Sequence, residues 1–166
     1  MKITGCILLI LSTTAVGFYL PTLLKQKIVL FNNLTLLAVN LSTAIRYNSA
    51  DIYSLLKNES IYNNLPILGD IIKGLENGDS LSNCWRAAVS DATTMYHLSA
   101  EDTAIIIQFG NSLGATDVEG QIEHLSFYKN IFQNKAKQLE SDYCTKAKLY
   151  KSLGLFGGMA IALVII

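Results

Sequence analysis

The two ends of the chain are its most apolar stretches, and each is free of charged residues. Residues 3–24 form a helix of roughly 33 Å if fully helical, which crosses a hydrocarbon core of roughly 30 Å. Residues 152–166 are short for a span of about 20 residues, but Lys148 and Lys151 can snorkel so that the span begins at residue 149. The pattern predicts transmembrane helices at residues 1–24 and 149–166.

Two other interpretations of the first segment are weaker. Ala15-Val16-Gly17 resembles a signal-peptide cleavage site, but only Lys2 precedes the apolar run, and that run continues past the cut. Cys6 follows a lipobox-like Ile-Thr-Gly, but it lies too close to the N-terminus for an apolar region to precede it. We therefore expect the segment to remain as a membrane span.

Between these ends, apolar residues recur at steps of three and four, which is the period of amphipathic helices. No strand hairpin is indicated, because Asn77-Gly78 is flanked by helical patterns. The fold class is therefore all-α. We expect a bundle of about five to six helices over residues 25–148, flanked by the two membrane helices. The helices are predicted at residues 25–47, 50–57, 66–76, 80–94, 99–114 and 117–151, with the caps Ser80, Ser99 and Asp117 included in the last three ranges.

Capping residues define several of these boundaries. Ser80 and Asp117 are expected to cap helix N-termini, and Ser99 is expected to form a capping box with Asp102. Gly114 suits a left-handed stop. Pro66 is expected in a first turn, where its missing N–H is tolerated.

The last helix carries an apolar seam that should face the core. Its predicted members are Val118, Ile122, Leu125, Tyr128, Phe132, Ala136, Leu139, Tyr143, Ala147 and Tyr150. Charged residues off the seam are expected in solvent, namely Glu123, Lys129, Lys135, Lys137 and Glu140. Trp85, the only tryptophan, is interpreted as a core anchor, with a contact to a partner as the alternative.

Flanking charge predicts the orientation. Lysines lie on the domain side of both spans, whereas only Lys2 lies on the other side. The positive-inside bias therefore places the central domain in the cytoplasm and both termini outside. The formal net charge is +0, so no basic excess indicates nucleic-acid binding.

No pattern indicates catalysis or a cofactor. P-loop, HExxH, GxSxG and GxGxxG motifs are absent, and Glu101-Asp102 sits at a helix start, where acid stabilises the dipole. The three cysteines are far apart without a CxxC, and the two histidines have no neighbours at ligand spacing, so no metal site is expected. We expect a protein that is not an enzyme and that acts through its interactions.

The second span contains a small-residue motif. Gly154 and Gly158 form a GxxxG pattern, and Gly157 adds a third small residue. Such a face lets two helices approach closely in a membrane. It is predicted to pack against the first span or against another subunit, and a homo-oligomer is among the expected assemblies.

Several segments resemble one family. Phe109-Gly110-Asn111-Ser112-Leu113-Gly114 followed by Asp117 resembles the FGxxLGxxD signature of the stage III sporulation protein AB family. Residues 150–158 resemble its closing motif, and Trp85-Arg86-Ala87-Ala88 resembles its tryptophan-bearing helix. The interaction residues implied are Trp85, Phe109, Gly110, Leu113, Gly114, Asp117, Gly154, Gly157 and Gly158.

The resemblance implies a role in sporulation. The family is similar to the inner-membrane platform protein F of type II secretion and type IV pili. The resemblance thus implies a two-pass protein of the mother-cell membrane around the forespore. Its expected partners are a secretion ATPase like stage III sporulation protein AA, other channel membrane proteins and the lipid bilayer. A membrane-anchored helical regulator or adaptor unrelated to secretion is the alternative.

Overall fold

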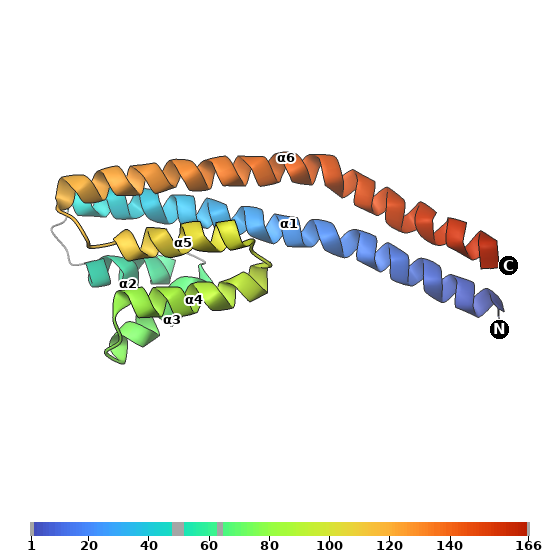
Figure 1. Cartoon of the computed structure of the whole chain (residues 1–166), viewed down its shortest axis with the longest axis horizontal. Coiled ribbons are helices and arrows are strands. Elements are labelled where there is room, and N and C mark those ends of the chain that lie inside the picture. Colours follow the sequence, from blue (N-terminus) through green and yellow to red (C-terminus); the bar gives the residue numbers. More distant parts are fainter. Residues whose placement is uncertain (1, 48–51, 63–64, 166) are drawn as a thin grey trace. The chain divides into compact units, whose positions relative to one another are not determined.

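The computed structural model describes residues 2–47, 52–62 and 65–165, and every element in these ranges is helical (Figure 1). The sequence prediction of an all-α fold is therefore confirmed for this part of the chain. The helices are α1 (Lys2–Tyr47), α2 (Ile52–Tyr62), α3 (Pro66–Glu76), α4 (Leu81–Tyr96), α5 (Ala100–Ser112) and α6 (Val118–Ile165).

The chain divides into two compact units. Unit 1 combines Met1–Ile28 with Lys137–Ile166, so the two ends of the chain belong together. Unit 2 is Val29–Ala136 and contains α2 to α5 with the adjoining parts of α1 and α6. In unit 1, Leu139 and Ala147 are buried, as the predicted seam requires.

Unit 2 is built around the apolar faces of its helices. The part of α1 in this unit contributes a fully buried stripe at helical spacing, formed by Phe31, Leu34, Leu37 and Leu41. Helix α6 contributes Leu125, Tyr128, Phe132 and Ala136, as the seam predicted. The intervening helices add the fully buried Leu56, Leu68, Ile71, Trp85, Val89, Ile106 and Phe109.

The predicted caps are present. The Ser80 hydroxyl accepts a hydrogen bond from the backbone N–H of Asn83, and Ser99 and Asp102 form a reciprocal capping box. Pro66 occupies the first turn of α3. Gly114 has φ +76°, a left-handed conformation that side chains other than glycine rarely adopt.

Three sequence predictions need correction. Helix α2 runs from Ile52 to Tyr62 rather than over residues 50–57. Val118 is 59% exposed because it lies in the first turn of α6, before the buried part of the seam begins. Lys135 is not solvated: its side chain is only 18% exposed, because the Asp102 carboxylate draws it inward.

Within the described residues, one segment is long and apolar enough to cross a membrane, Pro21–Tyr47. Its buried stripe in unit 2 shows that part of this apolarity serves the protein core. Most side chains of the spans predicted at residues 1–24 and 149–166 lie outside the described residues. The backbone of Lys2–Leu24 and of Leu149–Ile165 is helical.

Candidate functional site

The signature residues of α5 form the aromatic centre of unit 2. The ring of Phe109 has no exposed surface, and its centroid lies 5.2–5.5 Å from three other aromatic rings, those of Trp85, Tyr128 and Phe132. All three contacts are edge-on, the arrangement that aromatic quadrupoles favour. Phe109 therefore joins α4 to α6 through α5.

Gly110 allows α4 and α5 to approach closely. A Cβ atom at this position would overlap the indole ring of Trp85. The indole N–H donates a hydrogen bond to the carbonyl oxygen of Ile106 at 2.8 Å, so the buried ring has a polar partner. Trp85 is fully buried, which confirms its interpretation as a core anchor.

The second half of the signature shapes the turn between α5 and α6. Leu113 is buried beneath this turn. The Gly114 backbone N–H donates to Gln121 Oε1 at 2.6 Å, while Gln121 Nε2 donates to the Ser112 carbonyl oxygen at 2.8 Å. Asp117 caps α6, because its Oδ1 accepts from the Gly120 N–H at 3.2 Å. The sequence analysis did not identify Gln121. A glutamine side chain seven residues after Gly114 matches no capping motif, so the sequence gives no sign of this hydrogen bond.

Of the three glycines in the second predicted span, Gly157 lies in surroundings that the structure describes. A Cβ atom at Gly157 would meet no atom within 4 Å. The surroundings of Gly154 and Gly158 lie outside the described residues. Helix packing through these positions therefore remains a prediction.

A buried ion pair joins α5 to α6. Lys135 Nζ lies 2.7 Å from Asp102 Oδ1, and Asp102 Oδ2 accepts from the Ser99 backbone N–H at 3.3 Å. Glu101 adds a second carboxylate 3.8 Å from the ammonium group. One carboxylate thus serves both a helix cap and an interhelical ion pair. Helical periodicity alone placed Lys135 in solvent and missed this pair.

The two charges of this pair have shifted pKa values. Burial by itself raises the pKa of the Asp102 carboxyl, but Lys135 and the hydrogen bonds of Ser99 outweigh it and lower the pKa below its ordinary value. The Asp102 carboxylate raises the pKa of Lys135, against the opposing effect of burial. Both shifts favour the charged pair.

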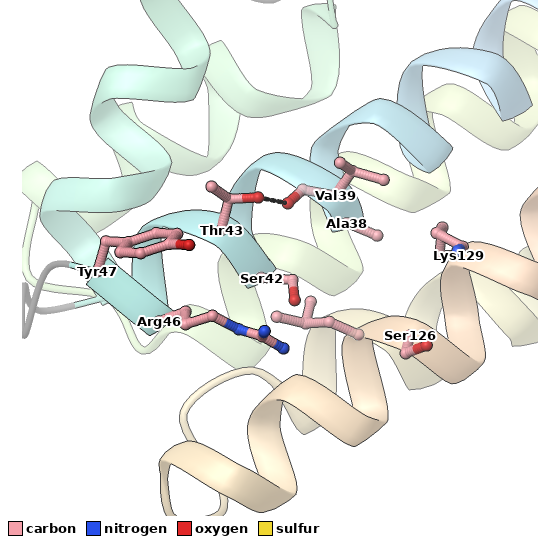
Figure 2. Close-up of a pocket in the computed structure, with 9 residues that line it drawn as sticks. Ala38, Val39, Ser42, Thr43, Arg46, Tyr47, Ser126 and Lys129 are labelled. Atoms are coloured by element: carbon pink, nitrogen blue, oxygen red, sulfur yellow. Dashed lines mark hydrogen bonds between the residues drawn. The ribbon is translucent and has the colours of Figure 1, made fainter.

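Two surface grooves of unit 2 carry opposite charge. The basic groove lies between α1 and α6, and Figure 2 shows Arg46 extending from α1 toward α6 and Lys129 standing on α6. Its remaining lining is neutral: Ala38, Val39, Ser42, Thr43, Tyr47, Leu125 and Ser126. The acidic groove lies along α3 and α4 and is lined by Asp70, Gly74, Asp79, Asn83, Cys84, Ala87, Ala88 and Asp91.

The described residues contain no group of His, Cys, Asp and Glu that could hold a metal ion. Cys84 is buried against α3, and burial raises the pKa of its thiol. The features that the structure does bring together are packed aromatic rings, an ion pair and two charged grooves. They define a helical protein whose described surface carries two grooves of opposite charge.

Comparison with known proteins gives a specific relationship. Residues 2–166 match the family model of stage III sporulation protein AB, and the chain belongs to this family. It is 20% identical over 169 residues to the stage III sporulation protein AB of Bacillus subtilis (strain 168), covering 99% of both chains. No solved structure is significantly similar to it. The family resemblance in the sequence is confirmed, and the chain is a sporulation-related protein.

Proposed function

We propose that this chain is the membrane platform subunit of a secretion-like channel complex between the mother cell and the forespore. The observation that carries the proposal is the family match over nearly the entire chain. In this role the protein has no catalytic step of its own. It couples a cytoplasmic ATPase, similar to stage III sporulation protein AA, to the membrane proteins of the channel.

The architecture of unit 2 suits this positional role. The Phe109 aromatic cluster and the Asp102–Lys135 ion pair hold α4, α5 and α6 together in its core. The surface grooves of these helices therefore keep a fixed arrangement. A rigid helical body can transmit the movement of an ATPase to a membrane assembly, whereas a flexible linker would absorb it.

We expect the ATPase and the channel proteins to meet different parts of the chain. A tagged full-length chain from sporulating cells should co-purify with a secretion-type ATPase and with channel membrane proteins. Gly158→Leu should lose the membrane proteins while retaining the ATPase, because a leucine on the glycine face keeps two spans apart. Quantitative mass spectrometry of the purified complexes measures both.

Ile161→Leu is the matched control, since Ile161 is exposed and the change preserves its apolar character. It should leave both sets of partners in place. Recovery of neither the ATPase nor any channel protein with the unchanged chain would contradict the platform role. Recovery of a signalling protein instead would favour the membrane-anchored regulator.

The proposal includes a two-pass topology with the central domain in the cytoplasm. The two chain ends belong to one compact unit, which suits two spans that enter the membrane from the same side. The candidate membrane-crossing segment, Pro21–Tyr47, lies near the N-terminus and overlaps the first predicted span at residues 21–24, which supports membrane association at this end of the chain. Lys25, Lys27 and Lys146 would then flank the cytoplasmic ends of the spans.

Cysteine labelling tests this topology. Cys144 is exposed and would lie in the cytoplasm, so it should react with a membrane-impermeant maleimide only after the cells are permeabilised. The measurement uses a Cys6→Ser, Cys84→Ser chain, in which Cys144 is the only thiol. In a chain that lacks all three native thiols and is produced in non-sporulating cells, so that it inserts into the cell-surface membrane, Lys2→Cys should react in intact cells. Labelling of Cys144 in intact cells would refute the predicted orientation.

A further inference from the structure

The basic groove borders apolar surface that the chain leaves uncovered. Leu36 is 48% exposed and Val39 is 40% exposed, and Val29 lies on the same side of α1 at helical spacing. The opposite side of α1 is fully buried in the core of unit 2. Because α1 is apolar on both sides, its outer stripe is typical of a surface that another protein covers.

The lining of the basic groove indicates the charge of the partner. Arg46 and Lys129 are its only charged lining residues. Arg46 also borders a neighbouring hollow that carries three carboxylates, those of Asp117, Glu119 and Glu123, so Lys129 carries most of the uncompensated positive charge of the basic groove. The groove also offers the hydroxyls of Ser42 and Ser126. An apolar surface with carboxylates would complement it.

The same chain presents such a surface. The acidic groove combines three aspartates with the small exposed side chain of Ala87, while Gly74 and the buried Ala88 form its floor, where α3 and α4 pack together. Its charged lining residues are all acidic. Asp70 is partly compensated by Lys73 at 3.6 Å, so Asp79 and Asp91 supply most of the available charge.

We propose that the acidic groove of one copy docks against the basic groove of a second copy of this chain. Helix α5 separates the helix α4 of the acidic groove from α6, because Phe109 contacts Trp85 on one side and Phe132 on the other. Figure 1 likewise shows α3 and α4 on the far side of unit 2 from α6. Each copy therefore presents its two grooves on different sides, and the contact is head-to-tail.

A head-to-tail contact has a structural consequence. It is heterologous, so successive copies form a closed ring if the rotation between them closes, and an open array if it does not. Assembly would cover the apolar stripe beside the basic groove. This inference goes beyond the proposed platform role and does not depend on which ATPase or channel proteins the chain meets.

Charge reversal on the full-length chain in detergent tests the docking. Arg46→Glu with Lys129→Glu reverses the basic groove, and Asp79→Lys with Asp91→Lys reverses the acidic groove. Each double variant alone should self-associate at least about tenfold more weakly than the unchanged chain, because opposed charges become like charges. Sedimentation velocity over a range of concentrations measures the dissociation constant, and circular dichroism confirms that the helices remain folded.

Mixing the two double variants is the decisive measurement. Each chain then meets a partner whose grooves are complementary to its own, so the mixture should recover the affinity that each variant alone has lost. Arg86→Glu is the control for a charge reversal as such, since it makes the same change as Arg46→Glu alone, at an exposed arginine of α4 outside both grooves. It should associate as the unchanged chain does.

Three outcomes would overturn the proposal. The first is an unchanged chain that stays monomeric at tens of micromolar. The second is self-association that is indifferent to both reversals, which would assign it to another surface such as the glycines of the second span. The third is a mixture that remains dissociated. The co-purification experiment is independent of all three, because it scores the ATPase and channel proteins.

Discussion

Gly110→Ala is expected to lower the free energy of unfolding by about 3 kcal/mol, at the upper end of the usual cost of overpacking a core. The added methyl group would overlap the indole of Trp85 rather than the end of a flexible chain. The ring cannot rotate away without losing its hydrogen bond to the Ile106 carbonyl oxygen and its packing against Phe109. Denaturant unfolding of the full chain in detergent, followed by the fluorescence of Trp85, measures the loss.

Gly69→Ala provides the matched control. Gly69 lies on the exposed side of α3, and a Cβ atom there would meet nothing within 4 Å. Alanine at this position should stabilise the helix by about 0.5–1 kcal/mol, because it restricts the unfolded backbone. If the Gly110→Ala chain unfolded at the same denaturant concentration as the unchanged chain, the conclusion that α4 and α5 pack in direct contact at Gly110 would be wrong.

Lys135→Met is expected to cost about 3 kcal/mol of unfolding free energy, near the lower end for removing one partner of a buried ion pair. Methionine preserves most of the aliphatic volume, so the loss isolates the charge. The Asp102 carboxylate, 5% exposed, would be left without its cation. Chemical denaturation in detergent again supplies the measurement.

The pH dependence separates this effect from a packing defect. Because the folded pKa of Asp102 is lowered, its contribution is complete above the unfolded pKa of about 3.9 and is lost as the pH falls below it. Because the folded pKa of Lys135 is raised, its contribution is complete below the unfolded pKa of about 10.4 and is lost as the pH rises through the folded value. The stability difference should therefore be constant between about pH 5 and pH 10 and shrink outside this window.

Lys137→Met is the matched control for this variant. Lys137 is exposed two residues further along α6, on another side of the helix, so its replacement should change stability by less than about 0.5 kcal/mol. Equal losses for the two lysines would show that the Asp102 pair contributes nothing. The unchanged chain and the Lys135→Met chain should differ less in unfolding free energy at pH 3 than at pH 7. If the difference is the same at both pH values, the loss comes from packing and not from the ion pair.

Much of the local structure was predictable from the sequence. Pro66 begins α3, Ser99 and Asp102 form the expected capping box, and Gly114 adopts the left-handed conformation predicted for it. These features depend on interactions within about one helical turn, so a short stretch of chain contains all the information they need. The predicted apolar seam of α6 is buried from Leu125 to Leu139, because the spacing of apolar residues along a helix already shows which side faces the core.

The family resemblance identified the signature positions without explaining them. Phe109, Gly110 and Leu113 are neighbours in one motif, but their roles depend on Trp85 of α4 and on Tyr128 and Phe132 of α6. No spacing rule relates residues on three different helices. A motif therefore predicted which residues matter, and the packing of the helices explains why.

By itself, the sequence determined the helical class, the position of most helix ends, the apolar segments at the termini and the family. Only the tertiary structure decided that Lys135 turns inward to Asp102, that Gln121 closes the turn after α5, and that the charged residues of unit 2 gather in two grooves of opposite sign. The physical reason is the range of the interactions. Helix propensity and capping act within a few residues, whereas ion pairing and groove formation depend on how each helix is rotated against its neighbours.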